Sequence, residues 1–244
     1  MEQAKQRQAH AVLDTSSRVA KAKKIEILMQ LGSYTEPLRV LEIGCGSGGI
    51  AYYFATHPTL ECEVFAVDVY DNRLVSDGYH FQKVDGVELP FFDHYFDLVI
   101  TNHVIEHVGE YSQQQRHLEE IKRVLKTTGQ CYLAVPNRWM LTEPHYNLKF
   151  LSWLPHSWRS SYLRFWGKGD FYDCEPFSLS GLESLLKQVD LKFENLSVQA
   201  TRVTLKLEMP SSSITSFLER VPDSVLQLLR PIIPTLIYKI ELKE

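Results

Sequence analysis

The chain carries two short groups of side chains that could accept protons or hold a metal ion. The first is His103-x-x-Glu106-His107, whose three side chains would share one face if the segment were helical. The second is Glu143-x-His145, at the start of a segment rich in aromatic residues. Imidazole and carboxylate groups act as general bases and also bind several divalent metals. We therefore take four residues as candidate catalytic groups: His103, His107, Glu143 and His145.

A glycine-rich turn precedes both groups. Residues 38–49 read Leu-Arg-Val-Leu-Glu-Ile-Gly-Cys-Gly-Ser-Gly-Gly, an apolar run typical of a buried parallel strand that breaks into glycines. Glycines at such a turn let a ligand lie against bare backbone N–H groups. Gly44, Gly46 and Gly49 also satisfy G-x-G-x-x-G, the dinucleotide fingerprint, so the turn alone leaves its cofactor open.

Strands and helices alternate around that turn. Apolar runs predict strands, and we expect them at residues 38–43, 63–68, 81–84, 96–101, 131–135, 193–201 and 235–242. This alternation predicts an α/β fold with a mostly parallel, doubly wound, Rossmann-like sheet.

Three helices are expected between these strands. The first follows the glycine turn at 49–57, and the second spans 112–126 with Ser112 and Gln115 as a capping box. The third begins at Ser180, where Glu183 completes another capping box.

The chain is expected to form a single domain over residues 1–244, with three additions. Residues 1–35 form a helical cap whose apolar face holds Ala22, Ile25, Leu28 and Met29. Residues 137–177 contain all four tryptophans and are expected to form a substrate-binding insertion. Residues 211–234 are expected to be a helical insertion between the last two strands.

Composition excludes several classes of protein. The formal net charge of −4 makes a nucleic-acid partner unexpected, because phosphate binding relies on clustered Lys and Arg. No apolar run is long enough for a membrane span, and the N-terminus lacks the apolar core of a signal peptide. Four cysteines without paired spacing are typical of a reducing compartment, so we expect a cytoplasmic protein.

Three carboxylates follow predicted strands, at the sheet edge where open α/β folds bind ligands. They are Glu42, Asp68 and Asp85. Asp68 suits the ribose hydroxyls of either a nicotinamide dinucleotide or an adenosine-containing sulfonium cofactor. A pyrophosphate would leave Glu42 without an obvious use, whereas a sulfonium cofactor needs no anion site.

The order of the motifs resembles that of class I S-adenosylmethionine-dependent methyltransferases over about residues 38–135. The matching segments are 41–48, 67–68, 85–91, 96–99 and 106–108. The resemblance implies a sheet order of 3-2-1-4-5-7-6 with the last strand antiparallel.

The same resemblance implies which residues bind S-adenosylmethionine. The glycines would contact its amino-acid part, Asp68 both ribose hydroxyls, Asp85 the adenine amine, and Asn102 the region of the methionine moiety. The full expected set is Glu42, Gly44, Cys45, Gly46, Gly48, Asp68, Val69, Asp85, Gly86 and Asn102.

A second resemblance concerns the acceptor of the methyl group. Segments 135–138, 143–148 and 153–155 resemble methyltransferases found with bacterial polysaccharide and O-antigen biosynthesis. This implies O-methylation of a sugar, glycan or glycolipid hydroxyl, with His107 or His145 as the proton acceptor. A glycolipid acceptor would suit a location peripheral to the inner face of the membrane, and 211–234 could touch a membrane or a partner subunit. The sequence does not specify an oligomeric state.

Several alternatives remain. Ubiquinone-pathway and small-RNA ribose O-methyltransferases bind a divalent metal with Glu-x-x-Glu-His, which would here become His103, Glu106 and His107. His103 replaces the first Glu, and Glu-His-Val is also common in metal-free relatives, so a metal-free site is favoured. A quinone-type small-molecule acceptor is a further alternative. From other classes, a nicotinamide-dependent oxidoreductase and a non-catalytic methyltransferase-like adaptor also stay open.

Overall fold

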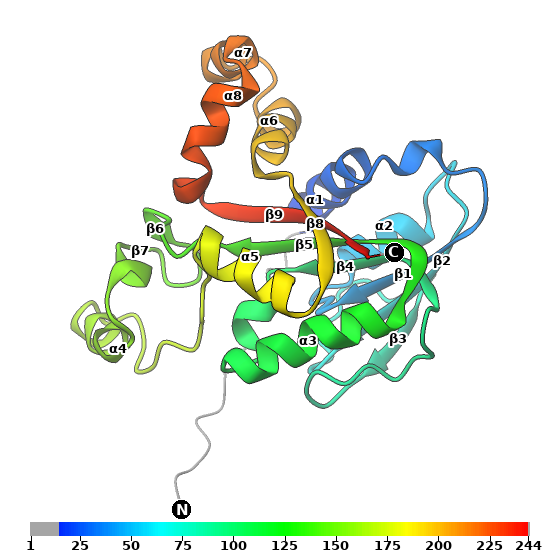
Figure 1. The fold of residues 1–244 in the computed structure, drawn as a ribbon, viewed down its shortest axis with the longest axis horizontal. Helices are drawn as coiled ribbons and strands as arrows, with labels where there is room; N and C mark the ends of the chain where they lie inside the picture. The colour runs from blue at the N-terminus through cyan, green and yellow to red at the C-terminus, as the bar shows by residue number, and fades with distance from the viewer. Residues whose placement is uncertain (1–14, 244) are drawn as a thin grey trace, which may run out of the picture.

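The computed structural model describes residues 15–243 and is built on one seven-stranded sheet (Figure 1). Across the sheet the strands lie in the order β3 (His80–Lys83), β2 (Cys62–Asp68), β1 (Leu38–Ile43), β4 (Phe96–Asn102), β5 (Leu125–Pro136), β9 (Thr235–Leu242) and β8 (Leu191–Asn195). The first five are parallel, whereas β9 is antiparallel to both of its neighbours. The predicted order, with an antiparallel last strand, is confirmed.

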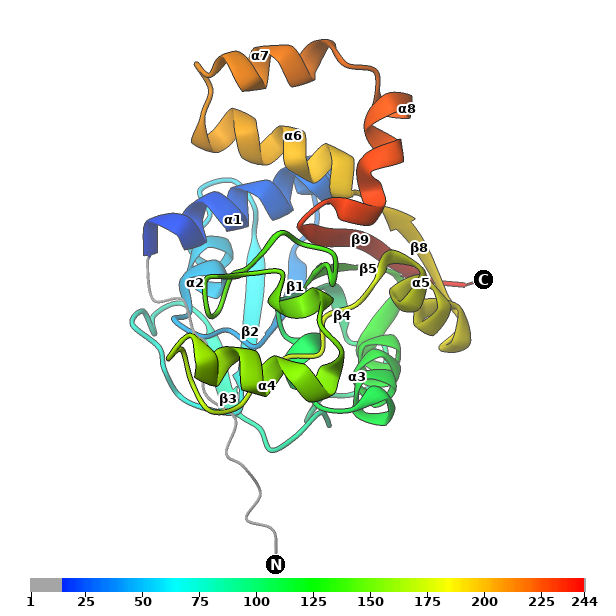
Figure 2. The same cartoon turned by 90° about the vertical axis from the view of Figure 1, so that its left-hand side faces the viewer.

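Helices cover both faces of the sheet. One face packs against α3 (Tyr111–Val124) and α5 (Leu179–Gln188), whose apolar stripes share a core with β4 and β5. The other face packs against α1 (Thr15–Leu28), α2 (Gly49–Ala55) and α6 (Ser197–Glu208). Figure 2 shows α6 lying alongside α1, with α7 (Ser213–Arg220) beyond it.

The apolar face predicted for the first helix is confirmed. Ala22, Ile25 and Leu28 on α1, and Met29 directly after it, are all buried against the sheet and α2. The beginning of the predicted N-terminal cap, residues 1–14, lies outside the described residues.

The predicted strand 193–201 is wrong beyond Asn195. The Asn195 side chain accepts a hydrogen bond from the Ser197 N–H, and α6 begins there. Leu196, Ala200 and Val203 then recur at helical spacing and pack into the core beneath α1. The helical insertion therefore starts well before residue 211, and it continues through α7, α8 (Asp223–Leu226) and the 3₁₀ segment η4 (Gln227–Ile232).

Two predicted helix starts are also wrong. Helix α3 begins at Tyr111 rather than Ser112, because the Glu110 carbonyl accepts from the N–H groups of Gln113 and Gln114. Helix α5 begins one residue before Ser180, and its cap is Ser178, whose hydroxyl accepts from the Gly181 N–H. In both cases the N-cap is a residue two positions before the serine of the predicted capping box, Glu110 for α3 and Ser178 for α5.

The aromatic insertion has a small core of its own. It contains a hairpin, β6 (Thr142–Glu143) and β7 (Leu148–Lys149), then η3 (Leu151–Trp153) and α4 (His156–Phe165). The buried residues that hold it together are Tyr146, Leu148, Leu151, Leu163, Tyr172 and Cys174. A bridge between Asn137 and Phe177 closes the insertion at its base, so the hairpin is fixed beside the end of β5.

Among the described helices, none combines the length and the apolar character that crossing a bilayer requires.

Candidate active site

A cavity of about 770 Å³ runs along the carboxyl ends of the parallel strands. Its lining begins at Asp85, after β3, and passes Asp68 and Gly44 to His103, after β4. On the far side it is closed by residues of the hairpin, among them His145. Because the strand order is 3-2-1-4-5, the cavity joins the predicted cofactor residues to the predicted catalytic histidines. A volume of this size holds a ligand of several hundred daltons.

Most of the predicted cofactor residues line this cavity. They are Gly44, Gly46, Asp68, Val69, Asp85, Gly86 and Asn102. They come from four different strand ends, and the sheet brings them to one edge.

The turn after β1 requires glycine. Gly44 and Gly46 have φ angles of +72° and +51°, in the left-handed region that L-residues with side chains rarely adopt. A Cβ on Gly44 would also lie 2.5 Å from a methyl group of Val104. The turn therefore exposes backbone to the cavity where any side chain would fill it.

The Asp68 carboxylate is held in place by backbone donors. One oxygen accepts from the Gly46 N–H at 2.8 Å and the other from the Tyr70 N–H at 3.2 Å. A carboxylate oxygen has more than one acceptor site, so a ligand hydroxyl can bind without breaking these bonds. Asp68 is thus oriented at the cavity wall with acceptor capacity to spare.

Open space lies beside Asp85. Gly86 has a φ of +80°, and nothing in the described part of the chain lies within 4 Å of the position that a Cβ would take there. A flat ring could lie against this backbone, close to the Asp85 carboxylate that also lines the cavity.

Three predicted cofactor residues lie behind the turn instead of on the cavity wall. Glu42 is buried, and its carboxylate accepts from the Ala51 N–H at 2.8 Å. Burial raises the pKa of Glu42 to about 8. Cys45 packs in the core beneath α1, and a side chain on Gly48 would meet the Tyr79 hydroxyl and the Val75 carbonyl. The cofactor contacts expected of Glu42, Cys45 and Gly48 stay predictions.

The N-terminus of α2 is covered, which bears on the choice between cofactors. Dinucleotide folds bind pyrophosphate at this helix N-terminus. Here the Leu74 and Val75 N–H groups donate to the Ser47 carbonyl, and Tyr79 lies over Gly48. Of the described residues, none from α2 lines the cavity. This arrangement disfavours a dinucleotide.

His103, Glu106 and His107 come together as predicted, although not through a helix. His103 has a φ of +60°, so the backbone turns there and no α-helix runs from His103 into the 3₁₀ turn η2 (Ile105–His107). Glu106 is fully buried, with one carboxylate oxygen 3.3 Å from His103 Nδ1 and 3.9 Å from His107 Nε2. Burial alone would raise the pKa of Glu106, but the two imidazoles outweigh it and lower the pKa. His103 and His107 reach the cavity, and Glu106 lies behind them.

His145 faces His107 at the end of the cavity that the hairpin closes. The two ring centroids are 4.9 Å apart and the rings are nearly perpendicular. Glu143 is fully buried behind His145: one oxygen accepts from the Tyr146 N–H at 2.8 Å, and the other lies 4.0 Å from His145 Nε2. Glu143 is thus placed to position the hairpin and His145, and a direct catalytic role for it stays a prediction.

The sequence did not indicate that Arg18, Lys21 and His117 line the cavity. Arg18 and Lys21 reach the cavity from α1, and burial together with the nearby charge of Arg18 lowers the pKa of Lys21 to about 8. His117 lines the cavity from α3, and burial lowers its pKa to about 4, so it is neutral at physiological pH. The only feature of the sequence that could have indicated Arg18 and Lys21 as cavity residues is the cluster of basic residues over 18–24. Such a cluster is equally typical of a helix face exposed to solvent.

Part of the chain matches a known protein family. Residues 41–133 match the family described as "Methyltransferase domain". The chain is 34% identical over 100 residues to a fatty-acid O-methyltransferase of Mycolicibacterium smegmatis. This alignment covers 38% of this chain and 35% of that protein. The chain is 35% identical over 97 residues to a phthiotriol/phenolphthiotriol dimycocerosates methyltransferase of Mycobacterium leprae, covering 37% and 35%. These matches span less than half the length of the curated relatives.

A solved structure shares the fold. Phosphoethanolamine N-methyltransferase 2 of Haemonchus contortus, in complex with S-adenosyl-L-methionine, superposes with a TM-score of 0.52 at 19% identity. The superposition covers 91% of this chain and 52% of that one. The strand order and the family match together define a Rossmann-like methyltransferase fold. Residues 41–133 thus match a methyltransferase domain, and the chain has the fold of class I S-adenosylmethionine-dependent methyltransferases.

Proposed function

We propose that the protein is an enzyme that transfers a methyl group from S-adenosylmethionine to a hydroxyl of a sugar, glycan or glycolipid. The observation that carries the proposal is the single cavity shared by Gly44, Asp68 and the histidines His107 and His145. Direct transfer of a methyl group between two bound molecules requires that the cofactor-binding residues and the proton acceptors face the same cavity.

The residues of the cradle fit this cofactor. Bound S-adenosylmethionine supplies an electrophilic methyl group on a positively charged sulfur. The turn at Gly44 offers bare backbone to the amino-acid part, Asp68 offers acceptors to the ribose hydroxyls, and the space beside Gly86 suits the adenine ring. Arg18 and Lys21 add positive charge at the cavity wall, which suits the carboxylate of the amino-acid part.

The proton of the acceptor hydroxyl is assigned to His107 or His145. Both imidazoles line the cavity, and each has a buried carboxylate within 4.0 Å, Glu106 for His107 and Glu143 for His145. A carboxylate behind an imidazole orients the ring and stabilises its protonated form. His103, which contacts Glu106 more closely, is a third candidate for the same task.

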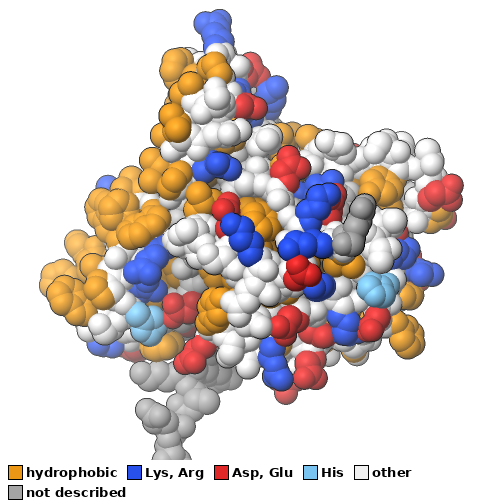
Figure 3. Space-filling view, viewed as in Figure 1, with side chains coloured by type: hydrophobic (Ala, Val, Ile, Leu, Met, Phe, Trp, Pro, Cys, Tyr) orange, Lys and Arg blue, Asp and Glu red, His pale blue; other side chains and the backbone are white. Residues whose placement is uncertain are grey.

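An amphiphilic acceptor is supported by the surface around the insertion. Trp158, Phe165 and Trp166 are exposed on or beside α4, and Trp139 is exposed where its ring packs against Trp153 of η3. Figure 3 shows hydrophobic side chains gathered on this side of the molecule. Two relatives are named for lipid substrates, which agrees with an acceptor that has an apolar part.

The same reasoning extends to a peripheral membrane contact. Phe217 on α7, and Leu228 and Ile232 in η4, leave more than half of their side chains exposed. Exposed apolar side chains on α7 and η4 suit insertion at a lipid interface. Vesicle flotation tests this contact: the double variant Phe217→Gln/Leu228→Gln should stay at the bottom of the gradient, and Ile27→Gln on α1 should float with the unaltered protein. Failure of the unaltered protein to float, or equal flotation of all three proteins, would overturn the contact.

The acceptor is tested by a transfer assay. The full chain is incubated with S-adenosylmethionine labelled in its methyl group and with separate pools of nucleotide-sugars, glycan extracts, glycolipids, fatty acids and quinols. Label in a sugar hydroxyl of a glycan or glycolipid supports the proposal. Label only in fatty acids or quinols overturns the acceptor class. Cofactor binding without transfer to any pool favours a non-catalytic adaptor.

A further inference from the structure

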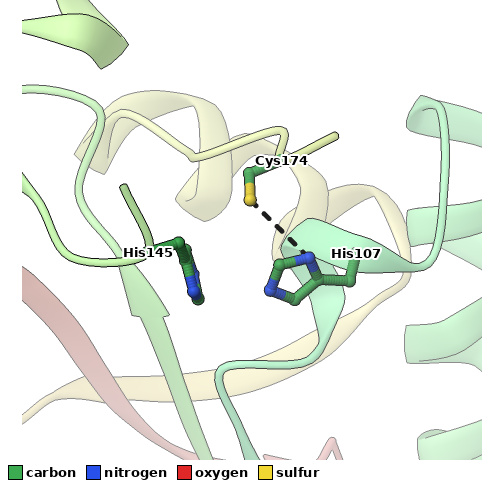
Figure 4. A group of neighbouring side chains, drawn as sticks. All are labelled: His107, His145 and Cys174. Carbon is green, nitrogen blue, oxygen red and sulfur yellow. Dashed lines mark hydrogen bonds between the residues drawn. The ribbon is translucent and has the colours of Figure 1, made fainter. Parts of the chain in front are cut away.

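Three side chains from distant parts of the chain meet at the end of the cavity that the hairpin closes. His107 comes from η2, His145 from the hairpin, and Cys174 from the connection between α4 and α5 (Figure 4). One potential ligand atom from each lies within 4.8 Å of those of the other two. Cys174 Sγ is 3.7 Å from His107 Nδ1.

We propose that His107, His145 and Cys174 bind a divalent transition-metal ion, with Zn²⁺ as the preferred ion. The set combines two imidazoles with one sulfur, which is the mixture that zinc and neighbouring borderline metals select over magnesium or calcium. Three protein ligands leave one tetrahedral position open, as in zinc sites that bind a substrate or water.

The spacing of the donors supports a common ion. With a Zn–S bond of about 2.3 Å and a Zn–N bond of about 2.0 Å, tetrahedral angles place sulfur and nitrogen roughly 3.5 Å apart. The observed separation of 3.7 Å between Cys174 Sγ and His107 Nδ1 is close to that value. These two ligands would need only a small adjustment to share an ion.

The environment of the ligands also suits a cation. His107 presents Nδ1 to Cys174 and Nε2 to the Glu106 carboxylate, 3.9 Å away. His145 Nε2 lies 4.0 Å from the Glu143 carboxylate, and a ligand atom of the same ring lies within 4.8 Å of those of His107 and Cys174. An imidazole between a metal and a carboxylate is the usual arrangement of metal-binding histidines. A bound cation would also compensate the buried charge of the two carboxylates.

This set differs from the one that the sequence suggested. The metal site suggested by the sequence consisted of His103, Glu106 and His107. In the structure Glu106 lies behind the two histidines, and Cys174, 67 residues after His107, lies next to His107 instead. Only His107 is common to both sets.

The role of the ion rests on the proposed function, whereas its binding does not. An acceptor hydroxyl in the open ligand position would have a lower pKa, because the ion stabilises the alkoxide. His107 and His145 would then act as ligands, and the released proton would pass to His103, the third candidate acceptor, which also lines the cavity.

Metal binding can be measured without any methyl acceptor. The chelator-treated full chain is titrated with Co²⁺, followed by its absorption spectrum, and with Zn²⁺ in competition. We expect one equivalent to bind, with intense tetrahedral bands and a sulfur-to-metal charge-transfer band. Cys174→Ala should abolish the charge-transfer band and weaken zinc binding by about tenfold or more. The matched control Cys62→Ala, on β2, should bind like the unaltered protein.

Two further measurements separate the possible failures. If Cys174→Ala does not fold, His145→Gln is compared with His80→Gln, and only the first should weaken binding. Absence of stoichiometric binding, or binding that neither Cys174→Ala nor His145→Gln affects, overturns the site. Calorimetry with S-adenosylhomocysteine is run on the same samples: cofactor binding without metal binding rejects this inference alone, and metal binding without cofactor binding rejects the proposed function alone.

Discussion

The Asp68 carboxylate accepts a 2.8 Å hydrogen bond from the backbone N–H of Gly46. This bond joins the end of β2 to the turn after β1, two neighbouring parallel strands whose ends meet at one sheet edge. The same two residues line the cavity. We therefore expect a single ligand to contact both Asp68 and the glycine turn.

Replacing Asp68 with Asn tests this pairing. The amide keeps one oxygen but loses the charge, so it can no longer hold the turn and two ribose hydroxyls together. Hydrogen bonds to charged groups contribute about 1.5–3 kcal/mol, so S-adenosylhomocysteine affinity should fall by about tenfold to a hundredfold. Calorimetry measures the change. Asp77→Asn, an exposed acid in the loop after β2, is the control, and equal affinity of the two variants would contradict the assignment.

Gly86→Ala tests the adenine end of the cavity. The added methyl meets no described protein atom within 4 Å, so the cost to stability is limited to the left-handed φ, about 1–2 kcal/mol. Cofactor affinity should fall because the methyl occupies space assigned to the ring. Thermal unfolding and calorimetry are compared with those of Gly32→Ala, which also has open space but an ordinary φ. Unchanged affinity in Gly86→Ala would show that the ring lies elsewhere.

Arg18→Gln tests the contribution of α1 to the cavity. Arg18 is buried at the cavity wall, where its charge is little screened by water. S-adenosylhomocysteine affinity should fall about tenfold, whereas adenosine, which lacks the carboxylate, should bind as before. Lys23→Gln, exposed on the same helix, is the control. An equal loss for both ligands would point to a general disturbance of α1.

Glu42→Gln tests the buried acid behind the turn. Burial raises the pKa of Glu42 from 4.5 to about 8, so the folded chain binds this proton more tightly than the unfolded chain. The stabilising contribution is complete below about pH 4.5 and is lost as the pH rises to about 8. Glu42→Gln cannot lose a proton, and its amide oxygen can still accept from Ala51. Its stability relative to the unaltered protein should therefore rise by a few kcal/mol between pH 5 and pH 8 in urea unfolding. Parallel curves for the two proteins, as expected for the exposed control Glu61→Gln, would contradict the burial argument.

Residues next to strand ends could be predicted because the pattern that places them is local. Gly44 and Asp68 each follow an apolar run directly, and parallel strand ends meet at one edge whatever the loops do. The strand order, by contrast, came from the resemblance to a family, since periodicity does not say which strands are neighbours.

Residues that reach the site from outside the sheet could not be predicted. Cys174 meets His107 only because the insertion folds on its own small core, and nothing near Cys174 in the sequence indicates that contact. Arg18 sits on a helix whose basic side chains are compatible with solvent or with the cavity. The strand predicted over 193–201 failed for a related reason: alternating apolar residues there also satisfy a helical face, and packing beneath α1 favours the helix.

We expect the cavity to bind S-adenosylmethionine and not a dinucleotide. Titration calorimetry of the full chain with S-adenosylhomocysteine and with NADH, at the same protein concentration, tests it directly. We expect one S-adenosylhomocysteine bound per chain, with binding weakened by Asp68→Asn, and no heat with NADH. Binding of NADH, or no heat with S-adenosylhomocysteine or S-adenosylmethionine, would contradict it.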